Sequence, residues 1–494
     1  MLAVYAPSLR HDFVYDDFEV ILQQEPLRSP ADLLHVFLEP HGLPSSQLPY
    51  YRAVPRATLL LQKTLQGDVP WPFHLGNALL AAAAGIVAFA LLRLPVFGTA
   101  LPVAWLAAAL FAVHPVASSV VYPIASGRET LLPGACWLVA VWGYLRGGPG
   151  GRALACGAFA LALLGKEQAI ALPGLFVLAD ALRLTPDPPG ARLGRWIVRF
   201  APVGLVVLLY LALRGFVMPP PGDVDLLSAL RLQPLGPIYS LLYSMQIVLT
   251  PFRGLVYEPA LAVWWSPLRL LVAVSVMTGL ALMLALRSAG DRRILVFWIG
   301  WALLSLALTA NFFPQETPFD DRFVFLASLA PIAMAARLAT ELWPEPRHRP
   351  AVLLAGGVLL LLAAGITVGR GAAFVDPVSF GRQWVRTNPL QANARFTLGT
   401  ALAREGADDE ALGHLEESVR LAPGYAAARY NLAVVLAHLG RLDEAAEQLE
   451  ALAALVPADP EPHAMLATIR ERQGRSTEAR THAGEAERRA AVRR

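Results

Sequence analysis

Two adjacent carboxylates near the start of the chain are the first residues whose types and spacing could do chemistry. Asp16 and Asp17 lie in the aromatic segment Phe13-Val14-Tyr15-Asp16-Asp17-Phe18, just ahead of a long series of apolar segments. A paired-acid loop beside a membrane is a candidate general base at the mouth of a lipid-facing site. The alternative is a polar loop with two solvated acids, and spacing alone does not decide between the two.

Basic residues recur where apolar segments meet polar ones, and cations at such positions could hold a phosphate and stabilise it as it leaves. The candidates for binding a donor phosphate are Arg52, Arg128, Lys166 and Arg322. The further site candidates around them are His74, His114, Glu129, Glu167 and Asp321. Ionisable groups at membrane depth are costly, so they usually serve binding or transport. The pairs Arg128–Glu129 and Lys166–Glu167 could instead be self-neutralising interface anchors. Ionisable residues occur, however, at four boundaries between apolar and polar segments that are expected on one side of the membrane, and this favours a functional site.

Composition places the chain among polytopic membrane proteins and indicates an all-α fold. The mean hydropathy is +0.48, and 16% of the residues are charged, against about a quarter in soluble domains. Apolar runs near the length of a membrane span recur along the sequence. The net charge of +3 gives no argument for nucleic acid. Cys136 and Cys156 fall within apolar runs and are typical of small buried hydrophobes.

Four regions are expected along the chain. Residues 1–74 form an extramembrane first loop with the acidic motif and short surface helices, and residues 75–369 form a transmembrane helical domain. Residues 370–389 are a linker, and residues 390–494 form a repeat domain. The expected spans are 75–94, 99–114, 129–145, 152–164, 168–182, 199–215, 266–286, 294–311, 322–340 and 351–369. The apolar but short segment 237–250 is expected to be re-entrant or to lie flat.

Arginine bias in the short loops predicts the orientation of the helices, because cytoplasmic loops carry an excess of Lys and Arg. Arginine-rich loops occur near 146–152, 183–199, 287–293 and 347–349. If these loops are cytoplasmic, the acidic first loop and everything after Arg370 lie outside the cytoplasm. The expected location is therefore a bacterial inner membrane, with the first loop and the repeat domain on the extracytoplasmic side.

A repeat of 34 residues runs through the C-terminal region. Leu398, Leu432 and Leu466 share this spacing, and the glycines Gly406, Gly440 and Gly474 follow it too. This period, with a small residue in the first helix and a glycine at the turn, is the tetratricopeptide pattern. About three repeats are present, and such repeats stack into a curved surface suited to binding peptides. The alternative is an unrelated helical bundle.

The chemistry that needs one carboxylate, several interfacial cations and a groove for a lipid chain is glycosyl transfer from a lipid-phosphate sugar. No phosphate-binding glycine loop of a nucleotide site precedes a helix, and no His/Cys group has zinc spacing. The sequence therefore predicts no cofactor and no metal ligand set, although a divalent metal stays open.

These motifs together resemble the transmembrane and tetratricopeptide-repeat-containing family of protein O-mannosyltransferases and its bacterial relatives. The segments that carry the resemblance are Phe13 to Asp17, Tyr51-Arg52, Phe73 to Asn77, His114-Pro115, Gly127-Arg128-Glu129, Lys166-Glu167, Asp321 to Phe325 and the C-terminal repeats. The resemblance implies a GT-C-type enzyme that uses a polyprenyl-phosphate sugar. It also implies that the first acid of the pair, Asp16, is the base.

The sequence is compatible with three functions. The first is transfer of mannose or another hexose from a polyprenyl-phosphate donor to Ser/Thr hydroxyls of extracytoplasmic proteins, with inversion. The second is a non-catalytic membrane scaffold whose repeats recruit a partner. The third is a lipid-linked sugar transferase acting on a polysaccharide or lipid. The expected partners are the lipid-linked sugar, the lipid bilayer and an acceptor protein or peptide held by the repeats, with no nucleic acid.

Overall fold

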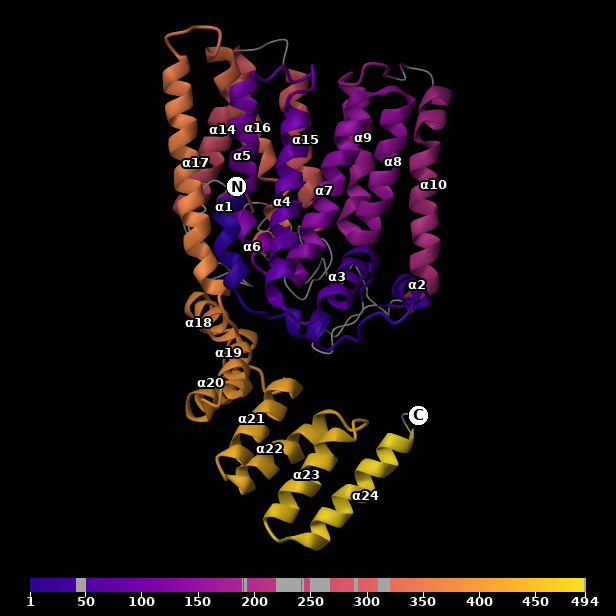
Figure 1. Ribbon diagram of the computed structural model, residues 1–494, viewed down its shortest axis with the longest axis vertical. Helices are drawn as coiled ribbons and strands as arrows, with labels where there is room; N and C mark the ends of the chain where they lie inside the picture. Colours follow the sequence, from indigo (N-terminus) through magenta and orange to yellow (C-terminus); the bar gives the residue numbers. More distant parts are fainter. Residues whose placement is uncertain are drawn as a thin grey trace. The chain divides into compact units, whose positions relative to one another are not determined.

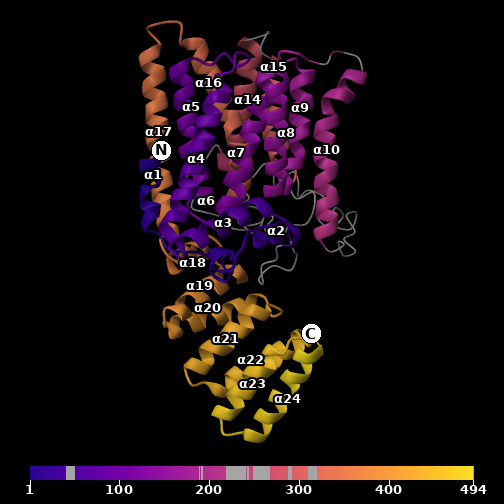
Figure 2. The ribbon, with the colours of Figure 1, turned by 45° about the vertical axis from the view of Figure 1, so that its right-hand side comes forward.

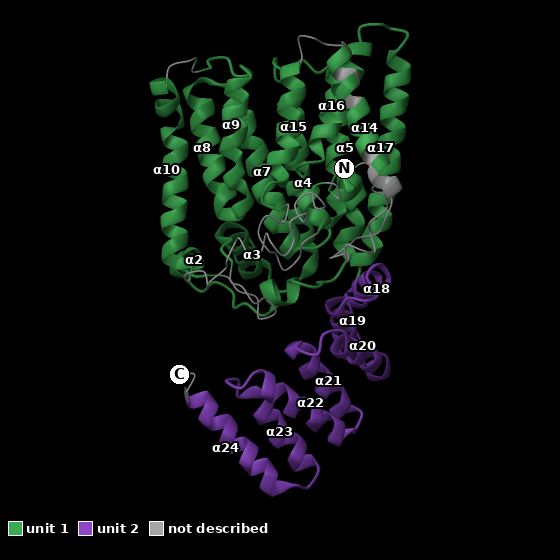
Figure 3. Cartoon of the chain, turned by 180° about the vertical axis from the view of Figure 1, so that it is seen from behind, with its two compact units in different colours: residues 1–375 green, residues 376–494 purple. Residues whose placement is uncertain are grey.

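The computed structural model divides the chain into two compact units, residues 1–375 and residues 376–494 (Figure 3). It describes residues 1–40, 50–188, 190, 193–218, 241, 244–248, 267–287, 292–309 and 320–492. The elements of these described residues are helices, with no β-strand among them, which confirms the all-α prediction. Segment 237–250, expected to be re-entrant, falls largely outside the described residues.

The first unit is a bundle of helices that run back and forth between two ends (Figures 1 and 2). Its longer helices are α4 (Pro70–Leu92), α5 (Leu101–Val113), α7 (Ala125–Arg146), α8 (Gly148–Gly165), α9 (Leu172–Ala181), α10 (Leu193–Val217), α14 (Pro267–Arg287), α15 (Arg292–Leu306), α16 (Leu329–Leu342) and α17 (Arg349–Gly371). By length and composition, four helices within the described ranges are able to cross a membrane, or five if the bent pair Leu101–Val113 and Pro115–Val121 counts as one span. Helices α5, α9 and α15 have 13, 10 and 15 residues, fewer than the roughly 20 that a single straight span requires.

Two of these helices turn apolar side chains outward, which identifies an integral membrane protein. Phe216 on α10 is 79% exposed and Leu361 on α17 is 74% exposed. Only 11% of the apolar window of each of these two helices is buried inside the protein. Contiguous apolar surface of this extent is stable against lipid and is rarely left facing water.

Close backbone contact joins α7 to α8 and sets the geometry of the centre of the bundle. Gly147 turns the chain between the two helices with a φ of 75°, a conformation that glycine adopts readily. A Cβ atom added at Gly151 would lie 2.5 Å from the carbonyl oxygen of Gly143. The two helices therefore pack with their backbones in contact, because neither position carries a side chain.

Short elements gather at one end of the bundle, where α2, α3 and α6 lie (Figures 1 and 2). They are α1 (Leu2–Tyr5), η1 (Ala6–Arg10), η2 (Phe18–Leu22), α2 (Pro30–Leu38), α3 (Ala53–Gln66), η3 (Pro115–Ala117), α6 (Ser118–Val121), η4 (Glu167–Ala171), η5 (Asp321–Val324) and η6 (Ala372–Phe374). The connections from α4 to α5, α7 to α8, α9 to α10 and α16 to α17 lie at the opposite end. The acidic motif thus lies at the end away from the arginine-bearing connections.

The second unit is a stack of three helix pairs that follow one further helix, α18 (Pro377–Thr387). The paired helices are α19 (Ala392–Arg404), α20 (Asp408–Leu421), α21 (Ala426–His438), α22 (Leu442–Leu455), α23 (Glu461–Arg472) and α24 (Ser476–Val492). Gly406, Gly440 and Gly474 have φ angles of 75–77° at the turns between paired helices. Only glycine adopts this conformation without strain, which explains why these three residues recur every 34 positions.

Most of the stretch 370–389, which the sequence analysis expects to be a linker, is helical. This stretch contains the end of α17, η6 and α18. Helix α18 packs Val378 against the same apolar core as Leu398 of α19, so it belongs to the second unit. The carbonyl of Val375, the last residue of the first unit, accepts a hydrogen bond from the backbone N–H of Asp12 at 2.9 Å. The chain therefore leaves the bundle beside the acidic motif.

This connection predicts that the repeat unit is on the same side of the membrane as Asp16. In a background without Cys136 and Cys156, a Glu405→Cys variant should react with a membrane-impermeant maleimide in outer-permeabilised cells. An Arg347→Cys variant, placed at the opposite end of the bundle, should react only after the inner membrane is opened. The reverse labelling pattern would overturn the proposed orientation.

Candidate active site

The two acids of the motif have different surroundings. Asp17 is 1% exposed, and its carboxylate accepts hydrogen bonds from the backbone N–H of Val14 at 3.0 Å and of Ala125 at 2.7 Å. Ala125 is the first residue of α7, so Asp17 fastens the acidic loop to the start of that helix. Both of its carboxylate oxygens are engaged by the backbone, which leaves Asp17 occupied with holding the loop.

Asp16 points instead toward a cation. Its side chain is 18% exposed and lies 3.9 Å from a terminal nitrogen of Arg322. Asp320 holds the other side of Arg322, accepting from its backbone N–H at 2.8 Å and from its Nε at 2.6 Å. Burial raises the pKa of Asp16 to about 8, Arg322 opposes this rise, and the nearby Glu129 adds to it. Asp16 is therefore a stronger base than an ordinary carboxylate.

Arg52 lies between two further carboxylates. Its guanidinium donates to Glu129 at 2.5 Å and to Glu167 at 3.2 Å. The Cζ atom of Arg52 also lies 4.5 Å from the centre of the Tyr50 ring. Arg52 thus joins α7 to η4 through the two acids, because Glu129 belongs to the first helix and Glu167 begins the second element.

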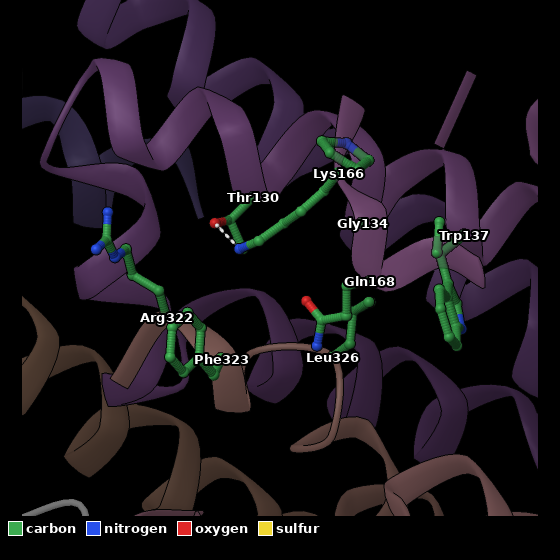
Figure 4. Close-up of a pocket in the computed structure, with 10 residues that line it drawn as sticks. Thr130, Gly134, Trp137, Lys166, Gln168, Arg322, Phe323 and Leu326 are labelled. Atoms are coloured by element: carbon green, nitrogen blue, oxygen red, sulfur yellow. Dashed lines mark hydrogen bonds between the residues drawn. The ribbon is translucent and has the colours of Figure 1, made fainter. Parts of the chain in front are cut away.

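Lys166 has a different kind of partner. It follows the last residue of α8, is buried, and donates from Nζ to the hydroxyl of Thr130 at 3.1 Å (Figure 4). Its Nζ atom also lies 5.4 Å from the centre of the Phe323 ring. Burial, together with Arg52 and Arg322, lowers the pKa of Lys166 to about 7, so an anion bound beside it would favour its charged form.

A pocket connects these cations to an apolar interior. It has an empty volume of about 330 Å³, part of which is open to solvent. Its lining comprises Thr130, Pro133, Gly134, Trp137, Lys166, Gln168, Ala169, Arg322, Phe323 and Leu326. Figure 4 shows Arg322 on one side of the pocket and Trp137 on the far side, with Lys166 reaching in between. The lining thus brings two basic side chains, Lys166 and Arg322, next to the apolar side chains of Trp137 and Leu326.

Arg128 is the one candidate cation whose guanidinium is held by neutral groups. Its Nε donates to the Asn77 amide oxygen at 2.7 Å, and a terminal nitrogen donates to Gln62 at 3.0 Å and to the Phe73 carbonyl at 3.3 Å. These partners belong to α3 and α4, and Arg128 is not among the residues that line the pocket. The structure therefore gives Arg128 the surroundings of a brace between α7, α3 and α4.

Three other candidates lie apart from the pocket. His74 is buried with its ring centre 5.8 Å from that of His11. The Nδ1 atom of His114 accepts a hydrogen bond at 3.3 Å from the backbone N–H two residues ahead, at the start of η3. Asp321 forms a buried ion pair with Arg370 of α17. None of the three is among the pocket-lining residues.

Sequence reasoning missed several residues that the structure brings to the site. They are Tyr50, Asp320, Thr130 and Gln168, and Arg370 lies outside the pocket as the partner of Asp321. Asp320 stands beside a candidate in the sequence, and Thr130 is a polar residue directly after one, so both carried a weak signal. Gln168, whose side chain donates to the carbonyl of Ser305, and Arg370 at the end of an apolar helix had no motif to mark them.

No group of three or more His, Cys, Asp or Glu side chains in the described part of the chain is arranged to hold a metal ion. The carboxylates near the pocket instead form ion pairs with arginines, two of them with Arg52 and two with Arg322.

Comparisons with known proteins identify the second unit by sequence. The model of the tetratricopeptide repeat matches residues 388–469, which confirms that prediction for the C-terminal region. No curated protein matches the chain. Among solved structures, MamA aligns with 33% of this chain and 88% of its own, at 19% identity and a TM-score of 0.23. The apo structure of ArnT from Cupriavidus metallidurans aligns with 93% of this chain and 78% of its own, at 16% identity and a TM-score of 0.42.

The bracing role of Arg128 is testable by its effect on stability. Arg128→Met removes the donor from the buried amide oxygen of Asn77 and from the half-buried one of Gln62, which should cost roughly 1–3 kcal/mol of unfolding free energy. The thermal midpoint of the detergent-solubilised protein should fall, whereas Arg293→Met, at an exposed position, should leave it unchanged. Equal midpoints for Arg128→Met and the wild type would show that Arg128 is not a brace.

Proposed function

We propose that this protein is a GT-C-type membrane glycosyltransferase. It transfers a sugar, mannose or another hexose, from a polyprenyl-phosphate donor to Ser/Thr hydroxyls of extracytoplasmic proteins. The observation that carries the proposal is the 3.9 Å approach of the Asp16 carboxylate to Arg322, which lines a pocket with a second cation and an apolar wall. A candidate base, two basic side chains for the phosphate and an apolar surface for the start of the lipid are thus close together.

Lys166 and Arg322 are the proposed phosphate-binding residues, because both line the pocket. Lys166 supplies a cation whose hydrogen bond to Thr130 can be exchanged for one to phosphate. Arg322 can bind phosphate with two parallel donors while Asp320 keeps its guanidinium in place. Arg52 is assigned to hold Glu129 and Glu167, because both carboxylates already bind it, and these acids can accept hydrogen bonds from sugar hydroxyls.

The proposed reaction is a single displacement. The acceptor hydroxyl loses its proton to Asp16 as its oxygen forms a bond to the anomeric carbon of the sugar. The bond between that carbon and the phosphate oxygen breaks, and its electron pair leaves with the lipid phosphate, where Lys166 and Arg322 stabilise the developing charge. Attack from the face opposite the phosphate inverts the anomeric centre, so a β-linked donor gives an α-linked product.

The other two functions make different demands on the chain. A scaffold has no use for a carboxylate held beside a cation-lined pocket, and a polysaccharide transferase leaves the tetratricopeptide repeats without a peptide to bind. Comparison of glycopeptides from envelope proteins of cells with and without this gene tests the choice directly. Loss of glycan from protein Ser/Thr sites supports the proposal, and loss from polysaccharide alone would favour the third function.

The base assignment predicts opposite outcomes for the two acids. Asp16→Asn keeps the side-chain shape but cannot accept the proton, so kcat should fall roughly 10²- to 10⁴-fold. Binding of the polyprenyl-phosphate donor and the thermal midpoint should stay close to the wild type. Asp17→Asn should lower the midpoint, because the loop loses an acceptor for Val14 or Ala125, and should reduce kcat less. Wild-type turnover in Asp16→Asn would remove the catalytic role of this residue.

The raised pKa of Asp16 predicts the pH dependence of transfer. The base acts when it is ionised, so kcat should rise with pH through the pKa of about 8 and level off above it. Arg322 opposes the rise, so Arg322→Gln should move the acidic limb of the profile to still higher pH. The measurement is kcat across the range that the protein tolerates. A limb centred near the ordinary carboxylate value of about 4 would contradict the assignment.

A further inference from the structure

Arg370 and Asp321 form an ion pair that the proposed reaction does not use. The guanidinium of Arg370, in the last turn of α17, contacts the carboxylate of Asp321, and both side chains are buried. Neither residue lines the pocket. A buried ion pair contributes little net stability compared with apolar side chains of similar size, although removing one partner leaves the other charge uncompensated. A role in fixing geometry is therefore a better account of the pair than stability alone.

The last turn of α17 is fixed against its neighbours by contacts other than the ion pair. The hydroxyl of Thr367 donates to the carbonyl of Val113 at the end of α5, at 2.8 Å. A Cβ atom added at Gly371 would lie 2.5 Å from the Tyr122 ring, so the helix backbone approaches that ring directly. These contacts make the end of α17 a fixed reference to which a neighbouring segment can be attached.

The segment that carries Asp16 and the segment that carries Arg322 are both bonded to the end of α17 or to the residues shortly after it. The acidic segment is attached four residues before Asp16, through the hydrogen bond from the N–H of Asp12 to the carbonyl of Val375. The η5 segment is attached through Asp321, the residue directly before Arg322. The distance between the base and the cation therefore depends on these two attachments, together with the bonds by which Asp17 fastens the acidic loop to α7.

Few contacts within the η5 segment fix the direction of the Arg322 side chain. It is a 3-10 helix of four residues, too short to set the direction of a long side chain by itself. Asp320 binds Arg322 within the segment, so this contact orients the guanidinium relative to η5 and not relative to Asp16. The orientation of η5 relative to the acidic loop has to come from a contact outside the segment, and the Asp321–Arg370 pair provides one.

We propose that Arg370 is a positioning residue for the transfer reaction, which acts through Asp321 to hold Arg322 beside Asp16 and the phosphate pocket. The inference rests on the proposed function, because Arg322 is taken there to bind the donor phosphate. Asp321 belongs to the positioning pair and makes no contact with substrate.

Arg370→Gln in the full-length protein should lower kcat roughly 10- to 100-fold, the range for residues that orient a functional group from behind. The KM for the acceptor should change little. The acidic limb of the pH profile should move to higher pH, because Asp16 loses part of the influence of Arg322 and keeps that of Glu129, Asp17 and Glu19. A merely structural defect would lower the amount of active protein and leave the limb where it is.

Thr367→Val is the matched control. It removes the hydrogen bond to Val113 but keeps the contact of Gly371 with Tyr122, which still fixes the helix end, and it does not touch η5. Its thermal midpoint should fall while its pH profile stays that of the wild type. An equal shift of the profile in Thr367→Val, or no shift in Arg370→Gln, would overturn the proposal.

Two further measurements keep the test decisive if Arg370→Gln folds poorly. Asp321→Asn, which nearly preserves the side-chain volume, should reproduce the kinetic defect, and the double variant should be no worse than either single variant. Additive losses would show that the two residues act separately and would overturn the proposal.

Binding of farnesyl phosphate to the purified protein separates this proposal from the proposed function. The probe carries a phosphate and a short prenyl chain but no sugar, so no transfer is required. Weaker binding in both Arg370→Gln and Asp321→Asn, with normal binding in Thr367→Val, supports positioning of Arg322 even if no glycosyl transfer is found. Wild-type binding in both variants would overturn the positioning role while leaving the transferase proposal intact.

Discussion

The structure around the pocket depends on the sharing of each arginine between two carboxylates. Arg322 lies between Asp16 and Asp320, and Arg52 lies between Glu129 and Glu167. Charges at the border of a low-dielectric region are costly unless opposite charges or hydrogen bonds compensate them. Sharing one guanidinium between two acids satisfies its donors and leaves each acid with spare acceptor sites. A polar substrate can then be bound without stripping any of these groups of all its partners.

Much of the architecture was readable because it follows from periodicity and composition. A helix covers most of each apolar run that the sequence analysis expects to span, and the 34-residue period corresponds to the helix pairs of the second unit. Glycines at left-handed turns are dictated by local sterics, so Gly406, Gly440 and Gly474 recur in register. Helix α18 was missed because its apolar residues, such as Val378 and Trp384, form a single short stripe with no repeat partner upstream.

The sequence predicts only some of the residues that the site contains, because the direction of a side chain depends on partners that belong to no motif. The charge pattern identified Asp16, Lys166 and Arg322, which the fold brings together. It could not separate Arg128 from them, since the residues that hold Arg128 are the ordinary amides Asn77 and Gln62. The ordering of the two acids came from a family resemblance and stays a prediction; the structure shows that the two differ, because the backbone N–H groups of Val14 and Ala125 bind Asp17.

The contacts made by the first two turns of α7 limit insertions and deletions in this part of the chain. Arg128, Glu129 and Thr130 are consecutive, and they face Asn77, Arg52 and Lys166 in turn. Successive helical residues are rotated by about 100°, so three neighbours serve three directions. Inserting one residue ahead of Arg128 would set Arg128 against Arg52, and deleting one there would leave Leu131 facing Lys166. This turn can accept conservative replacements, but its length is fixed by the three contacts it makes.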